Sequence, residues 1–212
     1  NGRAIQAATS HALRQNFSKM FDITYLGENG QKEFAWQNSW GFTTRSIGVM
    51  IMSHSDNKGL VLPPRVAPIQ AVLIPIYKGD NRDKINVAVN TLYKKLQETN
   101  PTLRLHLDDR TNVTPGFKYN QWELKGVPLR IELGERDIEK QTVVIARRDT
   151  GEKQVISWDE LDLSVINLLD TIQNDLRTKA KTSHNNAIVQ VRDWNGFMTA
   201  LQQNQLPLMP WC

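Results

Sequence analysis

Four side chains that can form hydrogen bonds stand close together near the start of the chain: Gln6, Thr9, Ser10 and His11, all within "QAATSH". They lead into "SHALRQNFSKMF", whose apolar spacing predicts a helix. One interpretation is structural, with Thr9 or Ser10 capping that helix through a hydroxyl group. The other is functional: a glutamine and a threonine hold a nucleotide while a histidine lines a small-ligand site, since helix starts often bind ligands. The two interpretations are compatible.

A second stretch, "SWGFTTR", runs from Ser39 to Arg45 and precedes a predicted helix over 46–54. A glycine inside a strand usually marks the close approach of another group to the backbone. Arg45 stands where the predicted strand should end, and apolar positions that suit a helix face follow it. The stretch therefore predicts either a ligand-facing strand or a buried edge strand with a solvated arginine.

No arrangement of nucleophile, base and acid is evident in the sequence. The four histidines are scattered, and no pair of them has metal-ligand spacing. There is no Walker loop, and no glycine fingerprint opens a helix. If the protein does chemistry, we expect positioning and charge stabilisation rather than covalent catalysis.

Composition sets the class of protein. The 212 residues are 40% hydrophobic and 23% charged, which is ordinary for a globular chain, and the net charge of +4 mildly favours a polyanionic partner. No apolar run is long enough to span a bilayer. The chain begins at Asn1 and its single cysteine is the last residue, Cys212, so we expect a piece of a longer polypeptide without an internal disulfide framework.

The elements that must position these residues fall into three blocks. The first, 1–65, ends in "GLVLPPRVAP", where paired prolines force an extended path. The second alternates strand and helix, the pattern of α/β layering. In it we predict strands at 71–76, 103–109, 129–133 and 142–148, and helices at 80–98 and 115–125. The third contains a helical stripe from Val165, a strand at 187–191 and a helix from Trp194.

Three long stretches together resemble one family. They are "QAATSHALRQNFSKMF", "QNSWGFTTRSIGVMIMSHSDNKGLVLPPRVAP" and "DDRTNVTPGFKYNQWELKGVPLRIELGERD". In this order and spacing they are similar to the C-terminal part of prolyl-tRNA synthetases of the eukaryote/archaeal type, members of class IIa. The resemblance implies an α/β protein with three parts: the end of an antiparallel-sheet catalytic domain (1–65), a mixed-sheet anticodon-binding domain (66–160) and part of a small C-terminal domain (161–212).

The resemblance also implies roles for the polar residues of the first block. "GFTTR" is similar to the third signature motif of class II synthetases, so Arg45 would lie against the nucleotide and stabilise charge at the α-phosphate, as suits an always-charged planar guanidinium. Gln6, Thr9, Thr43 and Thr44 would contact ATP, with Gln6 near its Mg²⁺. His11, Ser39, Trp40 and Gly41 would line the proline site, with the aromatic ring beside the imidazole. Ala7, Ala8, Arg14 and Ser55 depart from glycines expected in the family.

In the second block the resemblance points to anticodon reading. Alternation puts Arg130 and Glu132 on the strand face opposite Leu129, Ile131 and Leu133, so that this face would be free for bases. Glu123, Arg136 and Asp137 would converge on it. Carboxylates accept hydrogen bonds from guanine N1–H and N2–H, while arginine donates to O6 and N7, and proline anticodons carry two guanines. The alternative is a solvated ion-pair surface.

The function that the resemblance implies is proline–tRNA ligase, an ATP- and Mg²⁺-dependent cytoplasmic enzyme, of which this chain is one portion. Its partners would be tRNA(Pro), proline, ATP and a second copy of the chain in a homodimer, with no membrane involved. Cys212 would be the first ligand of a structural zinc, although one cysteine cannot make a four-ligand site. The rival hypothesis is a noncatalytic RNA-binding module derived from a synthetase.

Overall fold

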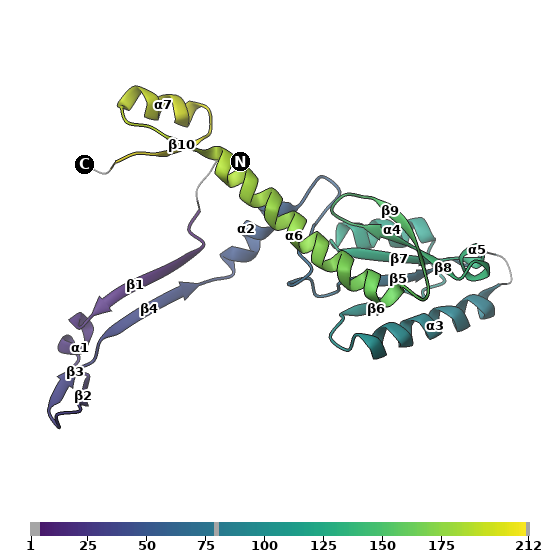
Figure 1. Cartoon of the computed structure of the whole chain (residues 1–212), viewed down its shortest axis with the longest axis horizontal. Helices are drawn as coiled ribbons and strands as arrows, with labels where there is room; N and C mark the ends of the chain where they lie inside the picture. Colours follow the sequence, from purple (N-terminus) through teal and green to yellow (C-terminus); the bar gives the residue numbers. More distant parts are fainter. Residues whose placement is uncertain (1–4, 79–80, 211–212) are drawn as a thin grey trace. The chain divides into compact units, whose positions relative to one another are not determined.

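The computed structural model describes residues 5–78 and 81–210 (Figure 1). The chain divides into two compact units, one running through Met50 and the other beginning at Ile51. We describe each unit by itself. The domain boundaries predicted after residues 65 and 160 stay predictions.

The first unit is built on an antiparallel pair of strands, β1 (Ala8–Arg14) and β4 (Gln37–Phe42). Between them lie the five-residue helix α1 (Asn16–Met20) and a hairpin of β2 (Thr24–Leu26) with β3 (Lys32–Phe34). The prediction of a helix over "SHALRQNFSKMF" is therefore wrong for its first half, and so is the N-cap role of Thr9 or Ser10. Pairing with the distant β4 overrides the local helical spacing, which only α1 retains.

Helix α2 (Arg45–His54) follows β4 and confirms the helix predicted over 46–54. It begins at Arg45, just after a turn in which Thr43 Oγ1 accepts a hydrogen bond from the Arg45 N–H at 3.3 Å. The division between the two units falls within this helix.

The second unit is organised around a five-stranded sheet with the order β6-β5-β7-β8-β9. Its strands are β5 (Ala71–Pro75), β6 (Leu105–Leu107), β7 (Leu129–Leu133), β8 (Thr142–Arg147) and β9 (Lys153–Ser157). The first three are mutually parallel, and β8 and β9 add antiparallel strands at one side. The four predicted strands are confirmed, while β9 was not predicted. Every residue of β5 is buried, as expected for a strand covered on both faces.

Alternate residues of β5 belong to two separate cores, one on each face of the sheet. Ala71 and Leu73 pack in the larger core with α3 (Arg82–Thr99) and α6 (Leu161–Ala187), whereas Val72 and Ile74 pack against Trp122 of α4 (Pro115–Leu124). Figure 1 shows α6 and α4 on different sides of the strands. The sheet face with the larger core is thus covered by two long helices. The other face is covered by the shorter helix α4.

The helix starts and stops predicted for α4 are confirmed. Thr114 Oγ1 accepts a hydrogen bond from Phe117 N–H, Pro115 opens the helix, and Gly126 beyond its end has a φ of 72°. In α3 the predicted stripe Ile85, Val89, Leu92 and Leu96 is buried. Helix α5 (Glu135–Glu139) after β7 was not predicted.

The last part of the second unit follows α6. Strand β10 (Ile188–Gln190) pairs in parallel with β11 (Leu206–Leu208), and helix α7 (Trp194–Gln202) connects them. Asp193 caps α7 by accepting a hydrogen bond from Gly196 N–H at 2.8 Å. The predicted strand at 187–191 and helix from Trp194 are confirmed.

Candidate functional site

The β1–β4 ladder brings several polar residues of the first unit onto one face. Thr9 lies opposite Gly41 and His11 opposite Ser39, and directly opposed residues of an antiparallel pair point to the same side. A side chain at Gly41 would not fit, because a Cβ there would lie 2.6 Å from Thr9 Oγ1. Glycine at this position therefore lets the threonine hydroxyl lie over the opposing strand. The result is a face carrying two hydroxyls and an imidazole.

Trp40 does not join that face. It pairs with Ser10, one residue out of phase with His11 and Ser39, so its side chain points to the opposite side of the ladder. Trp40 is 78% exposed. The predicted proline pocket with an aromatic ring beside the imidazole is therefore wrong as regards Trp40, because strand alternation separates the two groups.

Two departures from family glycines acquire a physical meaning in the structure. Arg14 has a φ of 52°, in the left-handed region that favours glycine, and it lies at the bulge that ends the β1–β4 ladder. Ser55, just after α2, has a buried hydroxyl without a hydrogen-bond partner among the described residues. The remaining predicted ATP contacts are exposed. Gln6 precedes β1 in the sequence, and Thr43, Thr44 and Arg45 follow β4.

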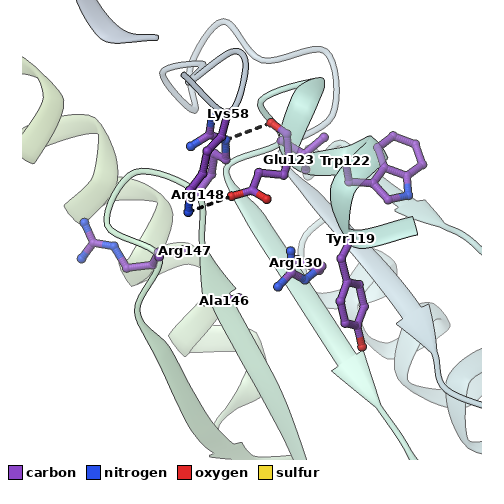
Figure 2. A pocket seen from close by; sticks show the side chains of 10 residues that line it. Lys58, Tyr119, Trp122, Glu123, Arg130, Ala146, Arg147 and Arg148 are labelled. Atoms are coloured by element: carbon purple, nitrogen blue, oxygen red, sulfur yellow. Dashed lines mark hydrogen bonds and ion pairs between the residues drawn. The ribbon is translucent and has the colours of Figure 1, made fainter. Parts of the chain in front are cut away.

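The second unit has a pocket of about 320 Å³ on the sheet face that α4 covers only in part. Figure 2 shows it between α4, the strands β7 and β8, and the loop that follows α2. Two residues predicted from the sequence line it, Glu123 near the end of α4 and Arg130 on β7. The charged and aromatic residues that the structure adds to its lining are Lys58, Tyr119, Trp122, Arg147 and Arg148.

Arg130 is held in place from two sides. Its Nε donates to Glu132 Oε1 at 2.9 Å, and its guanidinium lies 4.2 Å from the centre of the Tyr119 ring. Lys153 Nζ also donates to Glu132, at 3.1 Å from Oε1. Burial and then the nearby Glu132 carboxylate raise the pKa of Tyr119 well above its usual range, so the ring stays neutral beneath the cation. Arg130 is therefore preorganised for a planar partner.

The prediction that the whole Arg130–Glu132 face is free to read bases is wrong for Glu132. That side chain is only 8% exposed, and its carboxylate already accepts hydrogen bonds from Arg130 and Lys153. A buried carboxylate is stable only when paired, so Glu132 orients the two cations rather than a ligand.

The structure places Arg136 and Asp137 apart from the lining of this pocket. Both belong to α5, where the Asp137 carboxylate accepts a hydrogen bond from Gly134 N–H at 2.8 Å and Arg136 is exposed. Lys153 was not predicted as a site residue, because strand β9, which begins with it, was not predicted either. The alternating sequence "KQVIS" is a weak strand signal that could have indicated this strand.

A buried ionic network fixes α4 against the sheet. Asp108 accepts hydrogen bonds from Arg110 Nε and Trp122 Nε1, each at 2.7 Å, and its backbone carbonyl accepts from the buried Lys118 Nζ at 2.8 Å. Burial alone would raise the pKa of Asp108, but these donors and the Lys118 charge hold it well below its usual range. The network ties both Lys118 and Trp122 of α4 to the end of β6.

Metal ligands are not assembled in the part of the chain that the structure describes, which contains no group of three or more His, Cys, Asp or Glu side chains placed to hold an ion. Cys212 lies outside the described residues. Of the helices over 5–78 and 81–210, none is long and apolar enough to cross a membrane.

Comparisons with known proteins find relatives of the whole chain and a family match within the second unit. The profile of the family described as "Anticodon binding domain" matches residues 70–168. Over its full length the chain is 47% identical to a putative proline–tRNA ligase of Saccharomyces cerevisiae and 47% identical to the cytoplasmic proline–tRNA ligase of Arabidopsis thaliana. It spans 32% and 40% of those relatives.

A solved structure resembles the fold throughout. The crystal structure of prolyl-tRNA synthetase from Cryptosporidium parvum complexed with L-proline and AMP matches 100% of the chain, with a TM-score of 0.88 and 50% sequence identity. The chain corresponds to 45% of that protein.

Proposed function

The chain belongs to the prolyl-tRNA synthetase family, and on this premise we propose that it is the C-terminal portion of a proline–tRNA ligase. The enzyme joins proline to AMP with release of pyrophosphate from ATP, and then transfers the prolyl group to the terminal adenosine of tRNA(Pro). In such a reaction catalysis rests on positioning and on electrostatic stabilisation of phosphate charge.

The observation that carries the proposal is the β1–β4 ladder. It keeps Thr9, His11, Ser39 and Gly41 on one face, where a small zwitterion and a nucleotide can lie side by side. Both faces of the ladder are largely exposed, and a two-stranded pair is marginal in water. From these exposed faces we infer that a larger catalytic domain covers the ladder and completes the site.

In this site Arg45 is the catalytic residue. Its guanidinium binds the α-phosphate and stabilises the charge that develops as the proline carboxylate attacks. Thr9, Thr43 and Thr44 contribute hydroxyls on the ATP side, and His11, Ser39 and Gly41 line the proline side. Mg²⁺ would arrive bound to ATP phosphates, whose charge it neutralises, with the Gln6 carboxamide oxygen as a hard ligand of the type it prefers.

The second unit reads the anticodon. Glu123 accepts hydrogen bonds from a guanine N1–H and N2–H, and Arg130 donates to O6 or N7 of a base in the same pocket. Lys153, held on Glu132 beside Arg130, adds a donor that sequence reasoning missed. Arg136 and Asp137 contact the anticodon from α5, away from the pocket lining.

The remaining properties of the complete enzyme belong to the same proposal. The chain would comprise the end of the catalytic domain (1–65), the anticodon-binding domain (66–160) and part of a C-terminal domain (161–212). Cys212 would supply one ligand of a structural zinc whose other ligands lie elsewhere. The enzyme would act as a homodimer. It would be located in the cytoplasm, and the name of the Arabidopsis relative describes that protein as cytoplasmic.

Proline-dependent exchange of pyrophosphate into ATP by the full-length protein tests the proposal. We expect exchange without tRNA, and charging of tRNA(Pro) when tRNA is added. A noncatalytic RNA-binding module would bind the tRNA and give no exchange, and that result would establish the rival function.

A further inference from the structure

The loop after α2 is fastened to the end of α4 through backbone contacts. Leu60 N–H donates to Leu124 C=O at 3.0 Å, and Leu62 N–H donates to Gly126 C=O at 3.3 Å. A Cβ at Gly59 would lie 2.6 Å from Leu124 Cα, and one at Gly126 would lie 2.6 Å from Leu60 O. Only glycine permits this approach, since both also have positive φ, 134° and 72°. The loop is thus a fixed wall of the pocket in the second unit.

Arg148 locks the same loop through its side chain. Its Nη1 and Nη2 donate to the two carboxylate oxygens of Asp56 at 2.8 and 2.6 Å, and its Nε donates to the backbone carbonyl of Glu123 at 2.9 Å. The Arg148 side chain is only 5% exposed. The hydrogen bonds from Arg148 hold the pKa of Asp56 well below its usual range, so the pair stays ionised. The Arg148 guanidinium therefore joins the loop to Glu123 of α4.

Lys58 extends from this locked loop into the pocket (Figure 2). Its Nζ lies 3.5 Å from Glu123 Oε1, and its side chain is 69% exposed. The three lining arginines have tighter partners instead, each with a carboxylate oxygen at 2.6–2.9 Å. An exposed ion pair of this length contributes little to stability. Among the charged residues of the pocket lining, Lys58 is the cation most readily transferred to a ligand.

We propose that Lys58 is a further tRNA contact, whose ammonium binds a backbone phosphate next to the base read by Glu123, and that Asp56 and Arg148 are its positioning residues. The inference rests on the proposed function, because it assumes that an anticodon occupies this pocket. A compact ammonium on a flexible stem suits a phosphate, whereas the planar arginines suit base edges. When a guanine donates hydrogen bonds to the Glu123 carboxylate, Lys58 loses that carboxylate as its partner. The phosphate then pairs with the Lys58 ammonium instead.

The first test is Lys58→Ala in the full-length ligase, with kinetics of tRNA charging over a range of salt concentrations. We expect the KM for tRNA to rise several-fold and the slope of log KM against log salt to fall by about 0.7–1, the value for one phosphate contact. Lys58→Arg should restore both. Lys84→Ala, an exposed lysine of α3, is the matched control and should change neither.

Three results would overturn the assignment. A Lys58→Ala enzyme that behaves like Lys84→Ala shows that Lys58 does not contact tRNA. A changed preference among transcripts with altered anticodon guanines shows that Lys58 reads a base rather than a phosphate. Loss of proline-dependent exchange, which needs no tRNA, shows that Lys58 acts on activation instead.

The positioning role of Asp56 is tested by the same salt slope. Asp56→Asn leaves Lys58 present but breaks the charge pair with Arg148, so we expect the slope to fall as in Lys58→Ala. The double variant should then show no further fall, because the two changes remove one contact. Additive losses would contradict the positioning role. If wild-type enzyme fails to charge tRNA(Pro) at all, the proposed function itself is wrong, a result distinct from all of these.

Discussion

Arg45 is the residue on which the proposed chemistry depends most. It is exposed at the start of α2, where its backbone N–H donates a hydrogen bond to the Thr43 hydroxyl in the preceding turn. We predict that Arg45→Ala lowers proline-dependent pyrophosphate exchange by about 10²–10³-fold, the loss expected for one preorganised charge donor. The thermal unfolding midpoint should stay unchanged, since the side chain is not part of a core. Normal exchange by the folded variant would refute the catalytic role.

His11 gives a second prediction, with a control on the same strand. His11 shares a face with Ser39, whereas Ser10 points to the other side of the ladder. In the full-length enzyme we expect His11→Ala to raise the KM for proline with less effect on that for ATP, and Ser10→Ala to leave the KM for proline unchanged. Steady-state exchange kinetics measure both. If proline saturation is the same in the two variants, His11 is a structural residue.

Sequence reasoning at this scale identifies residue types better than their orientation. The run around Gly41 was recognisable, but which side chains share its face depends on register, and a shift of one residue moves every side chain to the other face. Trp40 was misplaced for that reason. Glu132 was misjudged for another: alternation shows that it leaves the main core, but not that α4 and Lys153 bury and pair it there.

The elements differ in how far local signals decide them. Helix α4 has its cap, its proline and its terminal glycine within its own sequence, and it was predicted almost to the residue. Strand β1 has none of these signals in its own sequence. What forms it is pairing with β4, which begins only after α1, β2 and β3. Its apolar spacing is compatible with either structure, so only the distant pairing settles which one forms.

At the scale of the element, Asp108 determines how firmly α4 is held. We predict that Asp108→Asn lowers the free energy of unfolding by about 3 kcal/mol, since it leaves the buried Lys118 without its counter-charge. Because the folded-state pKa of Asp108 is depressed, its contribution is present above about pH 4 and is lost as the pH falls toward the folded value. Urea denaturation at several pH values measures both effects.

The control for this variant is Asp159→Asn, an exposed carboxylate outside the network. It should leave the unfolding free energy within about 0.5 kcal/mol of wild type. An Asp108→Asn protein with wild-type stability and an unchanged acid response would show that the network does not anchor α4.

At the scale of the whole molecule, activation and anticodon reading are assigned to different units. We therefore predict that Arg136→Ala weakens charging of tRNA(Pro) by about 1–3 kcal/mol, the size of one lost base contact, while proline activation is untouched. It should also relax discrimination against transcripts that lack one anticodon guanine. Charging and exchange assays on the same preparation compare the two activities.

Lys140→Ala, at the C-terminal end of α5, is the control and should change neither activity. Unchanged charging and unchanged discrimination in Arg136→Ala would leave that arginine as a solvated surface charge. A uniform loss over all transcripts, with a smaller salt slope, would make it a phosphate contact instead.

The order of the sheet also determines when the second unit can form during synthesis. Of the five strands in this sheet, β5 leaves the ribosome first, but its neighbours β6 and β7 follow only after α3, and α4 separates those two. Parallel neighbours require such crossovers, so loop-closure entropy is lost before any ladder bond forms. Until β7 has emerged, the apolar residues of β5 have no complete sheet to enter and are open to aggregation or to chaperones. The strand that ends most deeply buried is thus the one that stays unprotected longest while the chain is being made.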